Sequence, residues 1–71
     1  MGSGIRQGLA KRIKELRKKA GLTQEKLFEI TKIDYKYLQK IEGRNPPDIR
    51  LETIERLARA LKITPSKLLD F

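Results

Sequence analysis

The apolar residues near the start of the chain recur at the spacing of an α-helix. They stand three or four positions apart, at Ile5, Leu9, Ile13, Leu16 and Ala20. An α-helix advances about 100° per residue, so this spacing gathers them on one face. Gly21 is a natural C-terminal stop, and Gly8 places the predicted start of the helix near Leu9. We therefore interpret residues 1–8 as a flexible N-terminus and residues 9–71 as one folded domain.

Two shorter helices are predicted next, with a short break between them. Thr23 is a good N-cap for the first, whose buried side comes from Leu27 and Ile30. Asp34 is an N-cap for the second, which covers residues 35–42. Thr31, Lys32 and Ile33 break the helical pattern between them, so the two segments form a helix, a tight turn and a helix.

The last third of the chain predicts two more helices. A loop at 44–48 precedes them and holds two adjacent prolines, which exclude helix there. The fourth helix directs five apolar side chains inward: Leu51, Ile54, Leu57, Ala58 and Leu61. Thr64 and Pro65 then supply an N-cap and a proline at the first helical position, which predicts a last helix over 66–70. No strand is predicted, so the expected fold class is all-α with five short helices.

The composition excludes several classes of function. Lys and Arg total 17 against 9 Asp and Glu, and the net charge of +8 favours a polyanionic partner. The chain has 0 Cys and 0 His, which excludes disulfides, thiolate or imidazole metal sites, and nucleophiles that rely on a His base. It has no Gly-rich phosphate loop either. We therefore expect a binding module without enzyme activity, cofactor or metal.

The sequence also gives an expectation for location. No apolar run approaches the roughly 20 residues that a membrane span needs. The start of the chain lacks the apolar core of a secretion signal. We expect a cytoplasmic protein without a membrane partner.

The predicted helix at 35–42 has two different sides. Its apolar side, formed by Tyr37, Leu38 and Ile41, must face the core. The opposite side carries four polar or aromatic residues: Tyr35, Lys36, Gln39 and Lys40. Such a face can enter a DNA major groove, where Lys reads guanine acceptors and Gln pairs with adenine. The aromatic ring of Tyr35 either stacks on a sugar or touches a thymine methyl. Taken alone, the same face is also typical of a solvated helix surface.

The preceding helix favours the DNA interpretation. A helix, a tight turn and a second helix with a basic outer face form the arrangement that lays the second helix in the major groove. The backbone N–H groups at Thr23 and Gln24 form a helix N-terminus, which attracts phosphate.

Several segments in the right order resemble one family, the phage-repressor/Cro-type (XRE-like) helix-turn-helix DNA-binding proteins. They are 22–25 (LTQE), 37–43 (YLQKIEG) with Asn45 and Pro46 after it, 57–61 (LARAL) and 64–69 (TPSKLL). The resemblance runs from about Leu9 to Leu69. It implies a compact five-helix, repressor-like DNA-binding domain in which helices 2 and 3 form the helix-turn-helix.

The resemblance also implies roles for individual residues. The family's base-contacting positions coincide with the outward side of the third helix, at Tyr35, Lys36, Gln39 and Lys40. The resemblance implies a contact of Gln24 with the DNA backbone, beside the phosphate contact that the helix N-terminus predicts for Thr23. Arg44 and Asn45 follow the third helix, where they either clamp a phosphate or are solvated surface residues. Arg17 is a further candidate for phosphate. Arg17 aligns with a family residue that pairs with Glu42, and this pair either positions Arg17 near phosphate or is an ordinary structural bridge.

Two residues depart from the family pattern. The family usually has a small residue at the position of Phe28, where the two helices cross, so Phe28 must tilt outward or widen the crossing. It usually has Gly at the position of Lys32, so Lys32 is expected to need a positive φ angle. Both changes bear on the docking angle of the third helix.

The end of the chain has two interpretations. Family members commonly dimerise through the last helix, which implies a homodimer formed by Leu68, Leu69 and Phe71. Alternatively, Leu68 and Phe71 close the core of the monomer. The leading hypothesis is a sequence-specific regulator that binds double-stranded DNA at a palindromic operator. The alternative is a protein-interaction module, antitoxin-like or an adaptor, whose basic face docks an acidic partner.

Overall fold

The computed structural model describes residues 3–71, and these residues fold into helices without a strand. Met1 and Gly2, part of the predicted flexible N-terminus, lie outside the described residues. The helices are α1 (Ser3–Lys19), α2 (Gln24–Thr31), α3 (Tyr35–Ile41), α4 (Leu51–Ala60) and α5 (Pro65–Leu68). The predicted all-α, five-helix fold is confirmed.

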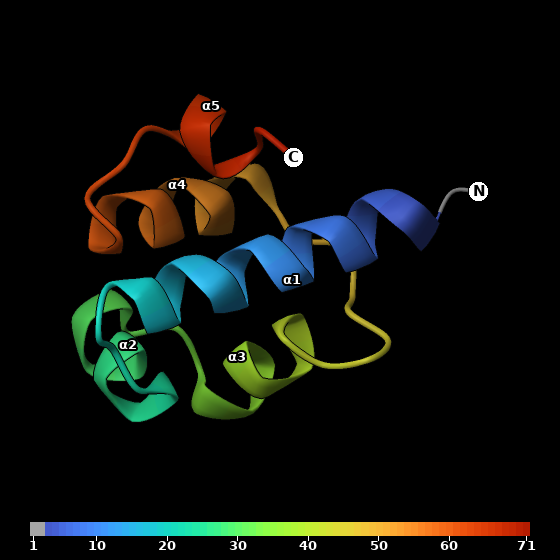
Figure 1. The fold of residues 1–71 in the computed structure, drawn as a ribbon. Helices are drawn as coiled ribbons and strands as arrows, with labels where there is room; N and C mark the ends of the chain where they lie inside the picture. The colour runs from blue at the N-terminus through green and yellow to red at the C-terminus, as the bar shows by residue number, and fades with distance from the viewer. Residues whose placement is uncertain (1–2) are drawn as a thin grey trace.

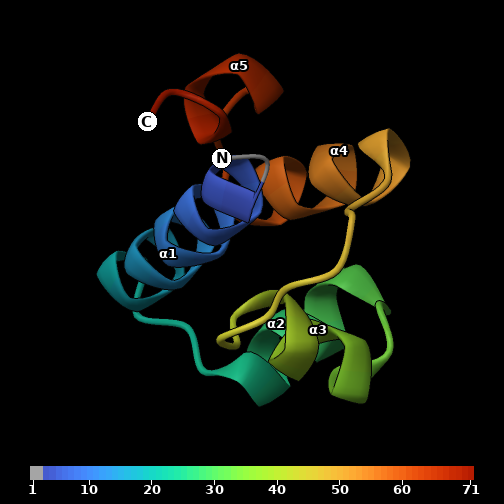
Figure 2. The same cartoon turned by 90° about the vertical axis from the view of Figure 1, so that its right-hand side faces the viewer.

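In Figure 1, α4 and α5 lie above α1, and α2 and α3 lie below it. Helix α4 also packs directly against α2, and the perpendicular view shows α1 to one side of these helices (Figure 2). Every helix contributes to one core, whose fully buried large side chains are Ile13, Leu27, Leu38, Ile41, Leu57 and Leu68. This arrangement leaves the outer surfaces of α2 and α3 free of other helices.

Three helices begin with a side-chain cap of the predicted kind. The side chains of Thr23, Asp34 and Thr64 each accept a hydrogen bond from the backbone N–H three residues later, at 3.0, 3.2 and 3.2 Å. Each bond satisfies an N–H that the first helical turn leaves without a partner. The caps fix where α2, α3 and α5 start, and α5 therefore covers Pro65–Leu68 where the sequence predicted 66–70.

The first helix begins earlier than predicted. α1 starts at Ser3, so residues 3–8, predicted to be flexible, are helical. Gly8 lies within this helix, and a Cβ built on it would stand 2.6 Å from the Phe71 ring. Gly8 therefore makes room for the C-terminal aromatic ring and does not mark a helix boundary.

Four apolar residues predicted to face inward are exposed: Ile5, Ala20, Ile30 and Leu51. Ile5 and Leu51 occupy the first turns of α1 and α4 and are 70% and 81% exposed. Ile30 is 48% exposed, because the buried side of α2 passes through Leu27 and Thr31, four residues apart.

Candidate nucleic-acid interface

The turn between α2 and α3 is built on a left-handed residue. Lys32 ends α2 with a φ of 61°, and its N–H donates to the carbonyl of Phe28 at 2.7 Å. The positive φ angle predicted for Lys32 is confirmed. Ile33 follows as a buried side chain, and Asp34 caps the next helix. Together, the left-handed Lys32, the buried Ile33 and the Asp34 cap set the orientation of α3 relative to α2.

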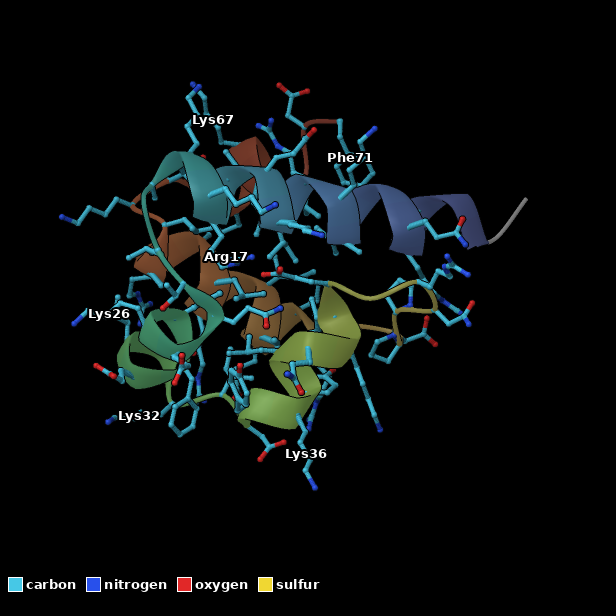
Figure 3. The ribbon with its side chains drawn as sticks, turned by 60° about the horizontal axis from the view of Figure 1, so that its bottom comes forward. Arg17, Lys26, Lys32, Lys36, Lys67 and Phe71 are labelled. Atoms are coloured by element: carbon cyan, nitrogen blue, oxygen red, sulfur yellow. The ribbon has the colours of Figure 1, made fainter. Side chains whose placement is uncertain are left out.

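Helix α3 presents the two sides that its sequence predicts. Leu38 and Ile41 are buried in the core, and Tyr37 is half-buried with its hydroxyl donating to the Asp48 carbonyl at 3.4 Å. On the other side Lys36, Gln39 and Lys40 are exposed and Tyr35 is half-buried. Figure 3 shows Lys36 projecting away from the body of the molecule. The outward side of α3 is therefore accessible to a ligand.

An aromatic contact joins α2 to the first residue of α3. The Phe28 and Tyr35 rings meet edge to face, with centroids 6.4 Å apart and an interplanar angle of 71°. Phe28 is 39% exposed, so it tilts outward, one of the two arrangements predicted for it. Its contact with Tyr35 was not predicted. The signal in the sequence is two aromatic residues seven positions apart across a tight turn.

A buried ion pair anchors the other end of α3 to α1. The Arg17 guanidinium donates to both Glu42 carboxylate oxygens, at 2.7 and 3.0 Å, and to the Leu22 carbonyl at 2.7 Å. Gln24 donates from Nε2 to the same carboxylate at 3.2 Å. The predicted pair of Arg17 and Glu42 is present and has the geometry of a structural bridge. The guanidinium of Arg17 thus donates three hydrogen bonds within the protein. Figure 3 shows Arg17 between α1 and the two helices α2 and α3.

The other candidate phosphate contacts flank α3. Thr23 is exposed and Gln24 is half-buried at the N-terminus of α2. Arg44 and Asn45 are exposed in the loop that follows α3. The helix-turn-helix thus has polar donors on both sides of its outward helix.

A family model described as a helix-turn-helix domain matches residues 10–70. The chain belongs to this family. The resemblance to XRE-like regulators is confirmed.

Relatives agree with this assignment. Control protein C.BamHI of Bacillus amyloliquefaciens is 32% identical, in an alignment that covers 100% of this chain and 88% of that protein. The restriction-modification controller protein C.AhdI from Aeromonas hydrophila is 35% identical, with a TM-score of 0.80, 87% of this chain covered and 92% of that chain. The clp gene regulator ClgR from C. glutamicum has a TM-score of 0.83 at 23% identity, with coverages of 92% and 82%, and shares the fold.

The C-terminal residues of this helix-turn-helix protein separate into two groups. Leu68 is 0% exposed, so its predicted part in a dimer contact is corrected: it closes the core of the monomer. Leu69 and Phe71 are 42% and 57% exposed. Phe71 and Lys36 lie on opposite sides of α1 in Figure 3. A contact at the C-terminal end would therefore leave the outward side of α3 uncovered.

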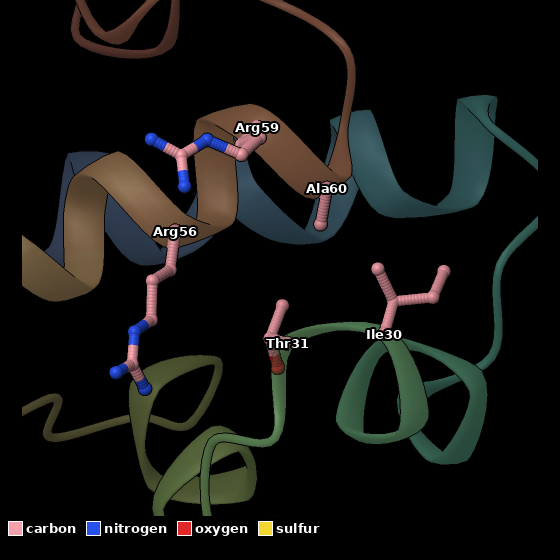
Figure 4. Close-up of a pocket in the computed structure, with 5 residues that line it drawn as sticks. All are labelled: Ile30, Thr31, Arg56, Arg59 and Ala60. Carbon is pink, nitrogen blue, oxygen red and sulfur yellow. The ribbon is translucent and has the colours of Figure 1, made fainter.

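A hollow of about 240 Å³ lies between the end of α2 and α4 (Figure 4). Its lining residues are Ile30, Thr31, Arg56, Arg59 and Ala60. Two guanidinium groups and aliphatic atoms dominate this lining, and the Thr31 hydroxyl donates to the Leu27 carbonyl at 2.7 Å. None of the five side chains is a carboxylate, thiol or imidazole, so the hollow lacks the groups that acid–base or metal chemistry uses.

Within residues 3–71 no three acidic, His or Cys side chains lie close enough together to hold a metal ion. Nor does any helix described there have the length and apolar character to cross a bilayer.

Proposed function

We propose that this helix-turn-helix protein is a sequence-specific transcriptional regulator that binds a two-fold symmetric DNA operator as a homodimer, with α3 in the major groove. One observation carries the proposal. Lys36, Gln39 and Lys40 are exposed on the side of α3 that faces away from the core. These side chains are rich in donors, and the groove edges of guanine and adenine offer acceptors to Lys and Gln.

The flanking donors supply the contacts that position α3. The α2 N-terminus at Thr23 and Gln24 suits one phosphate, because its backbone N–H groups point outward there. Arg44 and Asn45 suit phosphates on the other side of the groove. Arg17 acts through Glu42 by holding the end of α3 against α1. Asp34 is occupied as the N-cap of α3.

A homodimer would provide more DNA contacts than a single domain can make. A single small module makes few phosphate contacts, whereas two copies related by a two-fold axis place two α3 helices one DNA turn apart, roughly 34 Å. Leu69 and Phe71 are the exposed apolar side chains at the C-terminal end that suit such a contact. Dimerisation through them leaves α3 free to enter DNA.

The relatives support a regulatory role. C.BamHI is a control protein, and C.AhdI is a controller of a restriction-modification system. We assign this chain to the same functional class: a non-enzymatic regulator without a cofactor, acting in the cytoplasm.

Selection of binding sites from random duplexes tests the proposal. The expected product is an inverted repeat whose half-sites lie about one helical turn apart. Gel-shift competition at raised salt then compares this operator with random DNA, because a specific complex outlasts a purely electrostatic one. The operator proposal fails if no sequence is enriched, or if the selected DNA and random DNA are lost at the same salt concentration, and the alternative of a protein-interaction module is then favoured.

A further inference from the structure

The aromatic pair formed by Phe28 and Tyr35 lies at the N-terminal end of α3. Tyr35 is the first residue of α3, and base contacts in helix-turn-helix proteins come from the N-terminal residues of this helix. Phe28 belongs to the last turn of α2, and its carbonyl accepts the N–H of Lys32. Phe28 therefore lies one helical turn before Lys32, the residue at which the chain turns towards α3.

The contact has the geometry that orients a ring. Aromatic pairs favour edge-to-face arrangements with centroids about 4.5–7 Å apart, and this pair has 6.4 Å and 71°. Tyr37, on the other side of α3, is held differently, by a hydrogen bond from its hydroxyl to the Asp48 carbonyl. For Tyr35 the neighbouring aromatic contact is the ring of Phe28. Tyr35 is half-buried, so part of its ring remains accessible to a ligand.

We propose that Phe28 is a positioning residue which fixes the Tyr35 ring against the C5-methyl group of one thymine in each operator half-site. The inference rests on the proposed DNA-binding function. In the major groove the thymine methyl is the apolar feature of a base edge, and apolar side chains are its partners. A ring held from behind by a second ring presents its surface to that methyl at little cost in side-chain entropy.

Replacing single thymines by deoxyuridine tests this proposal, because the exchange removes the methyl and leaves every hydrogen-bonding group. The DNA is the operator selected with the wild-type protein. One thymine per half-site is expected to weaken wild-type binding by roughly three- to tenfold when it becomes deoxyuridine. Phe28→Ala and Tyr35→Ala should bind the two DNAs equally, and Phe28→Tyr, which keeps the ring, should restore the difference.

Two further variants separate the possible outcomes. Ile30→Ala removes another exposed apolar side chain of α2 and should keep the deoxyuridine effect. Lys36→Ala should lose discrimination at a different base pair and also keep the effect. If Phe28→Ala weakens binding to all DNA equally and preserves the deoxyuridine effect, Phe28 is structural only and the inference is overturned. Absence of any selected operator would instead overturn the proposed function.

Discussion

The Arg17 and Glu42 side chains form a charge pair that is 9% and 2% exposed and links α1 to the end of α3. Removing one partner of such a pair leaves the other charge buried without its counterion, which costs about 3–5 kcal/mol. We therefore expect Arg17→Met to lower the free energy of unfolding by that amount. Urea denaturation checks this, and a domain of this size has only about 4–11 kcal/mol to lose.

A double-mutant cycle separates the pair from its surroundings. Arg17→Met with Glu42→Leu removes both charges, and the double variant should lose much less than the sum of the two single changes. Additive losses would mean that the two residues stabilise the fold independently and that the short contact contributes little.

Local rules of the sequence account for most of the fold. The caps at Thr23, Asp34 and Thr64 depend on residues within three positions, and the core side of α3 depends on helical spacing alone. These features need no knowledge of the rest of the chain. The turn at Lys32 was predicted in another way: the family resemblance places glycine at this position, so Lys32 was expected to adopt a positive φ angle.

Contacts between distant segments explain the differences. Gly8 was interpreted as a helix boundary because glycine disfavours helix. Its actual role is to make room for the ring of Phe71, which lies at the other end of the chain and is invisible to a local rule. Helical spacing did not indicate that the Leu51 side chain is exposed at the start of α4. Nor did it show that Leu68 is buried while Leu69 is exposed. Helical spacing predicted that Lys36, Gln39 and Lys40 are exposed. It could not show that Tyr35 is half-buried or that it contacts the Phe28 ring, which comes from another helix.

Base-reading side chains should change specificity. We expect Lys36→Ala and Gln39→Ala each to reduce discrimination at particular operator base pairs by about 1–3 kcal/mol, because a good contact to a base edge has that value. Affinity for random DNA should change little. Competition of operators with single base-pair changes measures the effect, and equal losses on operator and random DNA would contradict the assignment.

A phosphate contact should behave differently. Arg44→Ala is expected to weaken binding to all sequences alike and to reduce the slope of log affinity against log salt by about 1. Arg56→Ala is the matched control, since Arg56 is an exposed arginine on α4 whose guanidinium lies 3.7 Å from Glu52. A change of base preference in Arg44→Ala, with the salt slope intact, would assign Arg44 to base reading.

The left-handed turn residue limits stability. A side chain with a Cβ at a φ of 61° carries strain of about 1 kcal/mol that glycine does not have. Lys32→Gly should therefore raise the free energy of unfolding by about 0.5–1 kcal/mol, partly offset by the greater freedom of glycine in the unfolded chain. Lys32→Ala removes the same charge but keeps the Cβ, so it should give no such gain in urea denaturation.

The proposed dimer contact can be broken without unfolding the monomer. Leu69 is 42% exposed, so Leu69→Glu should leave the monomer folded while it places a charge in the apolar contact. Sedimentation equilibrium should then report a monomer where the wild type is a dimer, and operator binding should weaken more than binding to a single half-site. Ile30→Glu puts the same charge on an apolar residue of α2 that is 48% exposed and should leave the dimer intact. If Leu69→Glu still sediments as a dimer, the two copies meet through another surface, and the spacing of their α3 helices must be set there.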